Sequence, residues 1–317
     1  MRPALSGFAI GLSIVLPAPR RPPITVGPAA VRMIMVAPGE SLRVTATGHG
    51  PTVVLVPGLF GSAFGYRHLM AALADSGYRA VVVEPLAIGG SSRPRDADYS
   101  LTAQSDRIAS ALGSLGVEPA IVVGHAVGGS MVLRLGYRHP ELVRAIVLLE
   151  GGPVEAAATP GFRRALSLVK WIKWLGGRRI LRGRIKKELM ASSADPAWVT
   201  DEVIEGYTAI ATAQLDQTLD AFRSMAKSQE PEQLVSHLQH ITCPIHLLMG
   251  MAPHRGGPPP EEVRLLGDRL PHFTIDSVPR AGHYLFEENA GAVLTIIASM
   301  RVALDRAAAV AAAGRPE

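Results

Sequence analysis

Cysteine is almost absent from this chain of 317 residues, because Cys243 is the only one. A single thiol excludes an internal disulfide and any metal site built on several cysteines, and it leaves the redox compartment open. Apolar residues make up 48% of the sequence, so a sizeable core is possible. This composition excludes collagen-like, wholly disordered and disulfide-built proteins.

The N-terminal region lacks an apolar run long enough to span a bilayer comfortably, since Ala4–Leu16 has only 13 residues. Five prolines between residues 17 and 28 argue against regular structure there. Residues 1–30 are interpreted as a disordered leader, or as a spurious leader if the start codon is mis-assigned and translation begins at Met33 or Met35. The alternatives are a signal peptide without a good cleavage site, or a membrane anchor. We expect a cytoplasmic protein, or a secreted or membrane-associated one if this run is a signal.

Short β-branched runs alternate with alanine-rich stretches of helical pattern from about residue 31 onwards. The middle runs are apolar on both faces, as expected for parallel strands covered by helices. This alternation predicts an α/β fold with a mostly parallel sheet flanked by helices. The predicted strands are Val53–Pro57, Arg79–Glu84, Ala120–Gly124, Ala145–Glu150, Ile245–Gly250 and Phe273–Val278, and the predicted helices are Tyr66–Ser76, Thr102–Leu115, Val127–Arg138, Glu261–Leu270 and Glu287–Leu304.

Two earlier runs, Val31–Val36 and Leu42–Thr47, are interpreted as an antiparallel hairpin at the edge of the sheet. A long segment later in the chain interrupts the alternation: 94 residues with helical pattern and no clear strand separate Glu150 from Ile245. This is too long for a loop, so it is interpreted as a helical insertion that caps the sheet. The predicted domains are a leader over 1–30, a core over 31–152 and 241–317, and a helical cap over 153–240.

Four motifs follow predicted strands: PGLFGS (Pro57–Ser62), EPLAIGGS (Glu84–Ser91), GHAVGG (Gly124–Gly129) and AGHYLFEE (Ala281–Glu288). Each is weak alone, but in this order they resemble the α/β-hydrolase family over roughly residues 40 to 305. The resemblance implies an α/β-hydrolase fold related to carboxylic-ester hydrolases. It also implies a small apolar substrate or ligand between core and cap, and no metal or organic cofactor.

The third motif resembles the family's nucleophile elbow, G-x-S-x-G, but Ala126 stands where the family has serine. Side chains beside the nucleophile would collide with the adjoining strand and helix, so the elbow needs Gly124, Gly128 and Gly129. His125 is the variable residue of the motif and is expected to pack beneath the turn. A methyl group has no lone pair and cannot form an acyl-enzyme.

The oxyanion hole depends on backbone groups and therefore survives the alanine. The resemblance implies that the N–H of Val127 donates to an oxyanion together with an N–H from Leu59 or Phe60. The positive end of the helix that begins at Val127 would add to this stabilisation.

His283 is the candidate base, because it follows a predicted strand within the fourth motif. The family usually places the acid after the strand predicted at Ile245–Gly250, but the loop Met251–Pro260 contains no carboxylate. A subset of the family places the acid after an earlier strand, where Glu150 lies in this chain. We therefore predict that Glu150 accepts a hydrogen bond from His283.

Three explanations for Ala126 remain open at this point. The alanine is an engineered replacement of the nucleophile, or it is natural in a non-catalytic binding protein. In the third explanation it is natural in an enzyme whose His283, oriented by Glu150, acts directly on a substrate proton or on water.

Positive charge is concentrated in Gly161–Lys187, which holds ten Lys and Arg residues and no acidic residue. The whole chain has a net charge of +5, so the remainder carries −5. Within this segment, Phe162–Leu175 has helical periodicity, and Trp171 and Trp174 fall on its basic face. A solvated helix docked by its apolar side is one interpretation, and weak contact with an anionic membrane is the other. Nucleic acid is not expected, because no binding motif accompanies the charge; the oligomeric state is left open.

Overall fold

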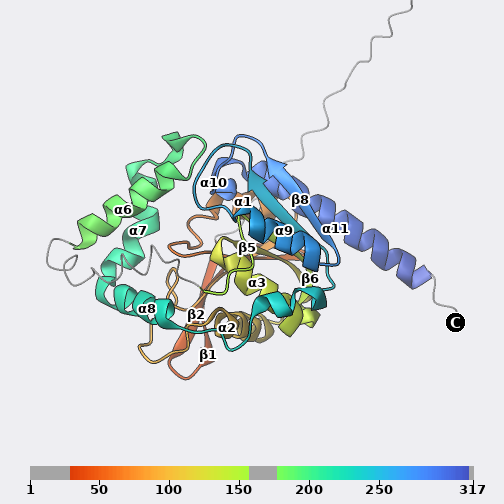
Figure 1. Ribbon diagram of the computed structural model, residues 1–317, viewed down its shortest axis with the longest axis horizontal. Helices are drawn as coiled ribbons and strands as arrows, with labels where there is room; N and C mark the ends of the chain where they lie inside the picture. The colour runs from red at the N-terminus through yellow and green to blue at the C-terminus, as the bar shows by residue number, and fades with distance from the viewer. Residues whose placement is uncertain (1–28, 157–176, 314–317) are drawn as a thin grey trace, which may run out of the picture.

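A computed structural model describes residues 29–156 and 177–313 of the protein. An eight-stranded sheet forms its centre, and helices connect most of the strands (Figure 1). The strands are β1 (Ala30–Ala37), β2 (Glu40–Gly48), β3 (Thr52–Val56), β4 (Arg79–Glu84), β5 (Ala120–His125), β6 (Val143–Leu149), β7 (Ile245–Gly250) and β8 (Phe273–Val278).

The sheet has the strand order β1-β2-β4-β3-β5-β6-β7-β8. β1 pairs with β2 and β2 pairs with β4 in the antiparallel sense, while all pairs from β4 to β8 are parallel. The predicted edge hairpin and mostly parallel sheet are thus confirmed. After β4 the chain crosses to β5 on the other side of β3, so the strand order reverses there. In open α/β sheets, ligands bind beyond the carboxyl ends of the strands at such a point.

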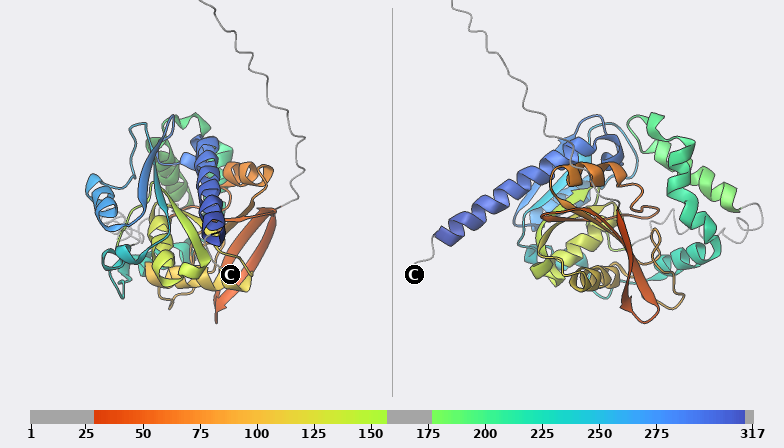
Figure 2. Two further views of the ribbon diagram at one scale, coloured as in Figure 1. Left: turned by 90° about the vertical axis from the view of Figure 1, so that its right-hand side faces the viewer. Right: turned by 180° about the vertical axis from the view of Figure 1, so that it is seen from behind.

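Helices lie on both faces of this sheet (Figure 2). α1 packs with α11 on one face, and α2 packs with α3 on the other. Short 3₁₀ helices lie at Pro140–Leu142, Pro196–Trp198, Leu234–Ser236 and Leu238–His240. The α-helices are α1 (Arg67–Asp75), α2 (Leu101–Ser114), α3 (Val127–Arg138), α6 (Gly177–Ala191), α7 (Asp201–Ala213), α8 (Leu215–Lys227), α9 (Pro260–Arg269), α10 (Leu285–Glu288) and α11 (Ala290–Ala313).

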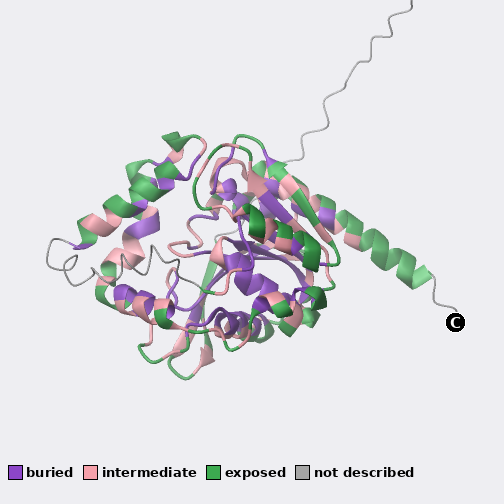
Figure 3. Ribbon diagram, in the orientation of Figure 1, coloured by how far each residue is buried: buried purple, intermediate pink, exposed green. Residues whose placement is uncertain are grey.

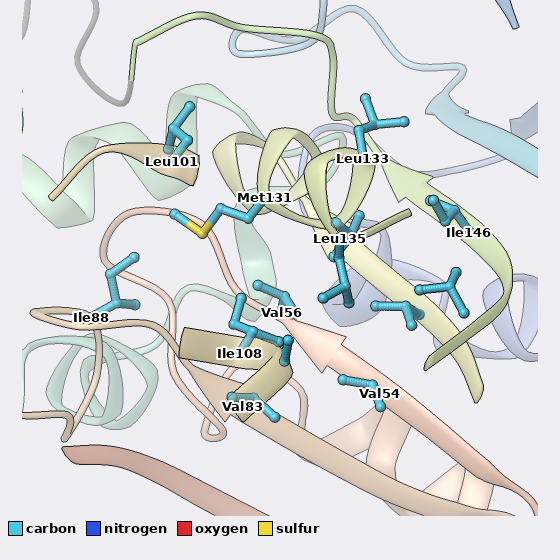
Figure 4. Packing of buried hydrophobic residues seen from close by; sticks show 14 of the residues in the cluster. Val54, Val56, Val83, Ile88, Leu101, Ile108, Met131, Leu133, Leu135 and Ile146 are labelled. Carbon is cyan, nitrogen blue, oxygen red and sulfur yellow. The ribbon is translucent and has the colours of Figure 1, made fainter. Parts of the chain in front are cut away.

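The core has two halves because successive side chains of a strand point to opposite faces. Val54 and Val56 of β3 join the cluster that contains α2 and α3, whereas Val53 and Leu55 join the cluster that contains α1 and α11. Figure 4 shows the first cluster, with Met131 of α3 among its members. The central strands β3–β6 are almost entirely buried, whereas the edge strands β1 and β8 and the C-terminal part of α11 are largely exposed (Figure 3).

Helices α6, α7 and α8 lie between β6 and β7 in the sequence and form a separate group beside the sheet (Figure 1). α6 and α7 share a small apolar cluster that includes Ile185 and Ile204, and Phe60 and Tyr284 from the core pack against it. The predicted amphipathic segment Phe162–Leu175, with both of its tryptophans, lies outside the described residues, as does most of the predicted leader. Within the described ranges, no helix is long and apolar enough to cross a membrane.

A buried arginine ties both ends of the cap segment to the core. Arg134 of α3 is fully buried, and its Nη2 donates to Glu155 Oε2 at 2.8 Å. Its Nε donates to Thr102 Oγ1 at 3.2 Å and lies 3.4 Å from Glu230 Oε2. Glu230 also accepts from the backbone N–H groups of Leu101 and Thr102 at the start of α2, at 2.6 and 3.0 Å. The chain therefore leaves and re-enters the core through one charged network.

Candidate active site

The turn between β5 and α3 has the geometry of a nucleophile elbow. β5 ends at His125 and α3 begins at Val127, and between them Ala126 has φ = 49° and ψ = −121°. Such a left-handed backbone is strained for a residue that carries a Cβ. A Cβ at Gly124 would lie 2.6 Å from the carbonyl oxygen of Gly128, and a Cβ at Gly128 would lie 2.6 Å from a carbonyl oxygen of β3. Side chains are thus excluded at Gly124 and Gly128, on either side of the turn.

Gly129, the last glycine of the motif, faces the neighbouring strand end. A Cβ there would lie 3.0 Å from the Cα of Gly151. The backbone N–H of Ala126 donates to Leu149 O at 3.0 Å, which holds the elbow against the end of β6. The close approach of these two strand ends brings Ala126 and Glu150 to the same part of the sheet edge.

Five non-glycine residues of the described chain have left-handed backbone, and each follows the carboxyl end of a parallel strand. They are Phe60 (φ 63°), Ala87 (68°), Ala126 (49°), Glu150 (51°) and Arg280 (54°), after β3, β4, β5, β6 and β8. Strained residues persist only where the surrounding structure holds them, and they are concentrated at functional sites. Backbone strain therefore marks this edge of the sheet independently of any motif.

The loop after β3, which contains Leu59 and Phe60, is held in place by Glu84 at the end of β4. Glu84 is fully buried; its Oε1 accepts from Ala63 N at 2.8 Å and its Oε2 accepts from Gly90 N at 2.6 Å. Burial raises the pKa of this carboxyl, and the two N–H groups act in the opposite direction. One carboxylate of the second sequence motif thus holds the residue that directly follows the first motif.

The backbone near Ala126 can stabilise negative charge. Val127 is the first residue of α3, so its N–H has no acceptor within the helix, and the positive end of the helix lies there. The predicted partner loop approaches the cap, because the Phe60 ring contacts that of Phe222 in α8 edge-on, with centroids 5.3 Å apart. A narrow cavity separates this loop from the cap and is lined by Phe60, Ser62, Ala87, Arg93, Tyr207, Phe222 and their neighbours.

His283 lies on the segment after β8 and is only 8% exposed. Its backbone N–H donates to Ser192 O at 2.8 Å, and its carbonyl oxygen lies 3.1 Å from His125 Nε2. Because a carbonyl only accepts, His125 carries its proton on Nε2. Burial, with His125 and His254 nearby, lowers the pKa of His283 well below 6.5. The ring is therefore neutral at pH 7, and its Nδ1 has no hydrogen-bond partner.

The predicted hydrogen bond between Glu150 and His283 is not formed. Glu150 is 2% exposed, and its Oε1 accepts from Gly250 N at 2.5 Å while its Oε2 lies 3.0 Å from His254 Nε2. Burial raises the pKa of the Glu150 carboxyl, although Gly250 and His254 act in the opposite direction. The predicted contact was wrong because the loop after β7 places His254, and not His283, within hydrogen-bonding distance of the Glu150 carboxylate.

The sequence does not indicate His254, because the resemblance implies a carboxylate and not a histidine in the loop Met251–Pro260. A usable signal is the pair Gly256–Gly257 next to it. A Cβ at Gly256 would lie 3.2 Å from the His283 ring, and a Cβ at Gly257 would lie 2.4 Å from Glu150 Oε2. These glycines let the loop backbone approach both side chains. Glu150, His254 and His283 consequently offer nitrogen and oxygen atoms that all lie within 4.8 Å of one another.

Comparison with known proteins is consistent with this geometry. The model of the α/β hydrolase fold family matches residues 51–176. A segment of 138 residues is 33% identical to bifunctional epoxide hydrolase 2 of Sus scrofa and covers 43% of this chain but only 25% of that protein. The sn-1-specific diacylglycerol lipase ABHD11 of Mus musculus is 25% identical over 250 residues, which cover 75% of this chain and 76% of the lipase.

Among solved structures, Cfl2 from Burkholderia cenocepacia aligns with a TM-score of 0.70 and 20% identity, over 86% of this chain and 95% of that chain. At this identity the likeness concerns the fold. The chain has the α/β-hydrolase fold, and its β5–α3 turn has the geometry of a nucleophile elbow that carries Ala126. It resembles esterases, epoxide hydrolases and lipases of this fold.

Proposed function

We propose that this protein is an enzyme that hydrolyses a small apolar carboxylic ester without a covalent intermediate, with His283 as the general base. The observation that carries the proposal is a strained elbow that retains its backbone donor but has no nucleophile, near a buried neutral imidazole. An unused elbow would gain stability from a relaxed turn, because left-handed backbone costs about 1–3 kcal/mol at a residue with a side chain.

In the proposed reaction, a water molecule attacks the acyl carbon while its proton passes to His283. The new bond joins the water oxygen to the acyl carbon, and the carbonyl oxygen becomes an oxyanion that accepts from the N–H of Val127. The acyl C–O bond then breaks, and the imidazolium returns the proton to the leaving alkoxide. The products are one carboxylic acid and one alcohol. An apolar substrate is our preference because Phe60, Ile210 and Phe222 are among the residues that line the narrow cavity between this loop and the cap.

The relatives support a hydrolytic reaction at this position in the fold. The pig protein is named as an epoxide hydrolase and the mouse protein as a diacylglycerol lipase, and both names describe hydrolysis. The carboxylic ester is our preference, because oxyanion stabilisation at an elbow serves a carbonyl substrate.

The test is hydrolysis of a series of short and medium p-nitrophenyl esters by the wild-type chain and by His283→Gln. His246→Gln is the matched control, since His246 lies on β7 and pairs with Asp276. We expect His283→Gln to lose about 10²–10⁴ of the catalysed rate, the usual contribution of a general base, and the control to lose none. Reaction in ¹⁸O water should place the label in the acid with no acyl-enzyme visible by mass spectrometry. Equal catalysed rates for wild type and His283→Gln would overturn the role of His283, and a wild-type rate equal to the uncatalysed one would overturn the proposal in favour of a non-catalytic binding protein.

A further inference from the structure

Three potential metal ligands meet at the carboxyl ends of three neighbouring strands. Glu150 follows β6, His254 follows β7 and His283 follows β8. One ligand atom from each lies within 4.8 Å of the other two, and no other such trio of His, Cys, Asp or Glu occurs among the residues that the structure describes. Glu150 and His283 are buried, and His254 is partly buried. Such a group of donors is enclosed rather than scattered on a surface.

With a neutral His254 ring, its hydrogen bond to Ala252 would leave two acceptor atoms, His254 Nε2 and Glu150 Oε2, facing each other. His254 Nδ1 lies 2.7 Å from the carbonyl oxygen of Ala252, so Nδ1 carries a proton and donates it. In the neutral ring, Nε2 then has a lone pair, and this atom lies 3.0 Å from Glu150 Oε2. Two acceptors at this distance repel unless a proton or a cation lies between them. A ligating histidine typically has the arrangement seen here, with its other ring N–H donated to a backbone carbonyl.

His283 supplies an independent observation that points to a ligand. Its Nδ1 is buried and has no hydrogen-bond partner, whereas buried polar atoms in proteins are almost always paired. The ring packs against Gly256, and a side chain at Gly257 would collide with the Glu150 carboxylate. The loop after β7 therefore closes on the three donors without placing a side chain among them.

We propose that Glu150, His254 and His283 bind a divalent transition-metal ion with the coordination chemistry of Zn²⁺, through a carboxylate oxygen, Nε2 and Nδ1 respectively. Zinc accepts this set of two imidazoles and one carboxylate at about 2.0–2.2 Å, with a fourth position left for water or a ligand. At such bond lengths, two ligand atoms 3.0 Å apart subtend about 95° at the metal, which is an ordinary coordination angle. The widest pair must close from at most 4.8 Å to about 3.4 Å, a movement within reach of side-chain rotation.

This site does not depend on the proposed function. A metal ion on His283 Nδ1 leaves the ring proton on Nε2, so the metal-bound form cannot use this ring as a base. In the metal-free protein, His283 is available as the base. In the metal-bound protein, the metal ion would be a Lewis acid at the same position. Because binding can be measured without any substrate, and the ester assay can be run on chelator-treated protein, failure of the ester assay and failure of metal binding are separate results.

The experiment measures metal binding to chelator-treated, untagged protein. Zn²⁺ is titrated by calorimetry, and Co²⁺ is titrated by its visible absorption, which reports tetrahedral coordination. We expect one equivalent to bind to the wild type and at least a 100-fold weaker affinity in His254→Gln. Glu150→Gln is the second variant, because glutamine keeps the size of the side chain and can still accept from Gly250. His246→Gln, which changes a histidine outside the cluster, should bind like the wild type.

Folding of each variant is checked by circular dichroism, and Zn²⁺ should raise the Tm of the wild type but not that of His254→Gln. The inference is overturned if the wild type binds neither ion, or if both His254→Gln and Glu150→Gln bind as tightly as the wild type. In the first case a proton alone occupies the space between Glu150 and His254. In the second case the ions bind to other histidines of the chain.

Discussion

Ala126→Ser adds a single oxygen atom at the elbow, and its effect on ester hydrolysis can be estimated from the contacts of His283. Cβ is already in the nucleophile position, and the absence of a side chain at Gly58 leaves room, since a Cβ there would lie 3.2 Å from the Cβ of Ala126. The serine would have an oxyanion donor and a candidate base, but that base has no orienting carboxylate, because Glu150 bonds to His254 and Gly250. The variant therefore has the nucleophile and the base of a catalytic triad, but no carboxylate that orients the base.

The loss of the acid sets the expected rate. Removing the orienting carboxylate from a complete triad lowers kcat by about 10⁴. With a typical kcat of about 10 s⁻¹ for a complete enzyme, Ala126→Ser should acylate at about 10⁻³ s⁻¹. Acylation would then take about a quarter of an hour, and deacylation should be slow as well. We expect an acyl-enzyme to accumulate that the wild type cannot form.

The assay is incubation with a short p-nitrophenyl ester, followed by mass spectrometry of the intact chain and of its peptides. The label should appear on the peptide that contains residue 126. Ser130, which donates to Gly152 O at 2.6 Å, is excluded as its site by the variant that also carries Ser130→Ala. Adding His283→Gln to Ala126→Ser should abolish acylation. A folded Ala126→Ser chain that stays unlabelled over a range of acyl lengths would refute our account of the elbow. Turnover near 10 s⁻¹ would instead show that Glu150 turns to His283.

Other expectations concern packing, thiol chemistry and charge. Gly128→Ala should destabilise the chain by about 1–3 kcal/mol through overpacking, measured by urea unfolding, whereas Gly113→Ala, with nothing within 4 Å of the new Cβ, should not. Burial raises the pKa of Cys243 to about 11, so its reaction with a thiol reagent should be slow at pH 8 and should accelerate about tenfold per pH unit towards that value; a fast reaction of the folded chain at pH 8 would contradict the burial. We also propose weak binding to anionic vesicles through the basic segment Gly161–Lys187, in which Arg178 and Arg179 of α6 are exposed and each cation contributes about 1 kcal/mol. Co-sedimentation should decrease with salt and should be absent with neutral vesicles; equal binding to both kinds of vesicle would leave the charge without this role.

The fold could be predicted almost entirely from local patterns. Each predicted strand of the core is present, and α3 has the predicted bounds, Val127–Arg138. The other predicted helices are present too, except that the one predicted at Glu287–Leu304 is divided at Asn289 into α10 and α11. The glycine-rich turn fixes the start of this helix, and Pro140 follows its end. Parallel strands buried on both faces have sequences that differ clearly from those of the amphipathic helices around them, so periodicity alone separates the two.

The side-chain pairing within the site could not be predicted in the same way. Sequence spacing correctly indicates that Glu150 lies at a strand end, but it does not determine which neighbouring side chain the carboxylate contacts. That choice depends on the path of the loop after β7, and two glycines in that loop allow His254 to approach. Pairing therefore depends on backbone closure between segments about 100 residues apart, for which no local pattern exists.

The contact between Phe60 and Phe222 has a consequence for how the protein would exchange substrate and product. Phe60 belongs to the loop expected to supply an oxyanion donor, and its ring lies against α8 of the cap. An outward displacement of α8 would remove this contact of a residue whose backbone is already strained, while the hydrogen bonds that Glu84 accepts from Ala63 and Gly90 would still hold the rest of the loop. Opening the entrance would then change the surroundings of the Phe60 N–H, and closing it would restore them around the molecule inside. The position of the cap would in this way be coupled to the geometry of the proposed oxyanion donor.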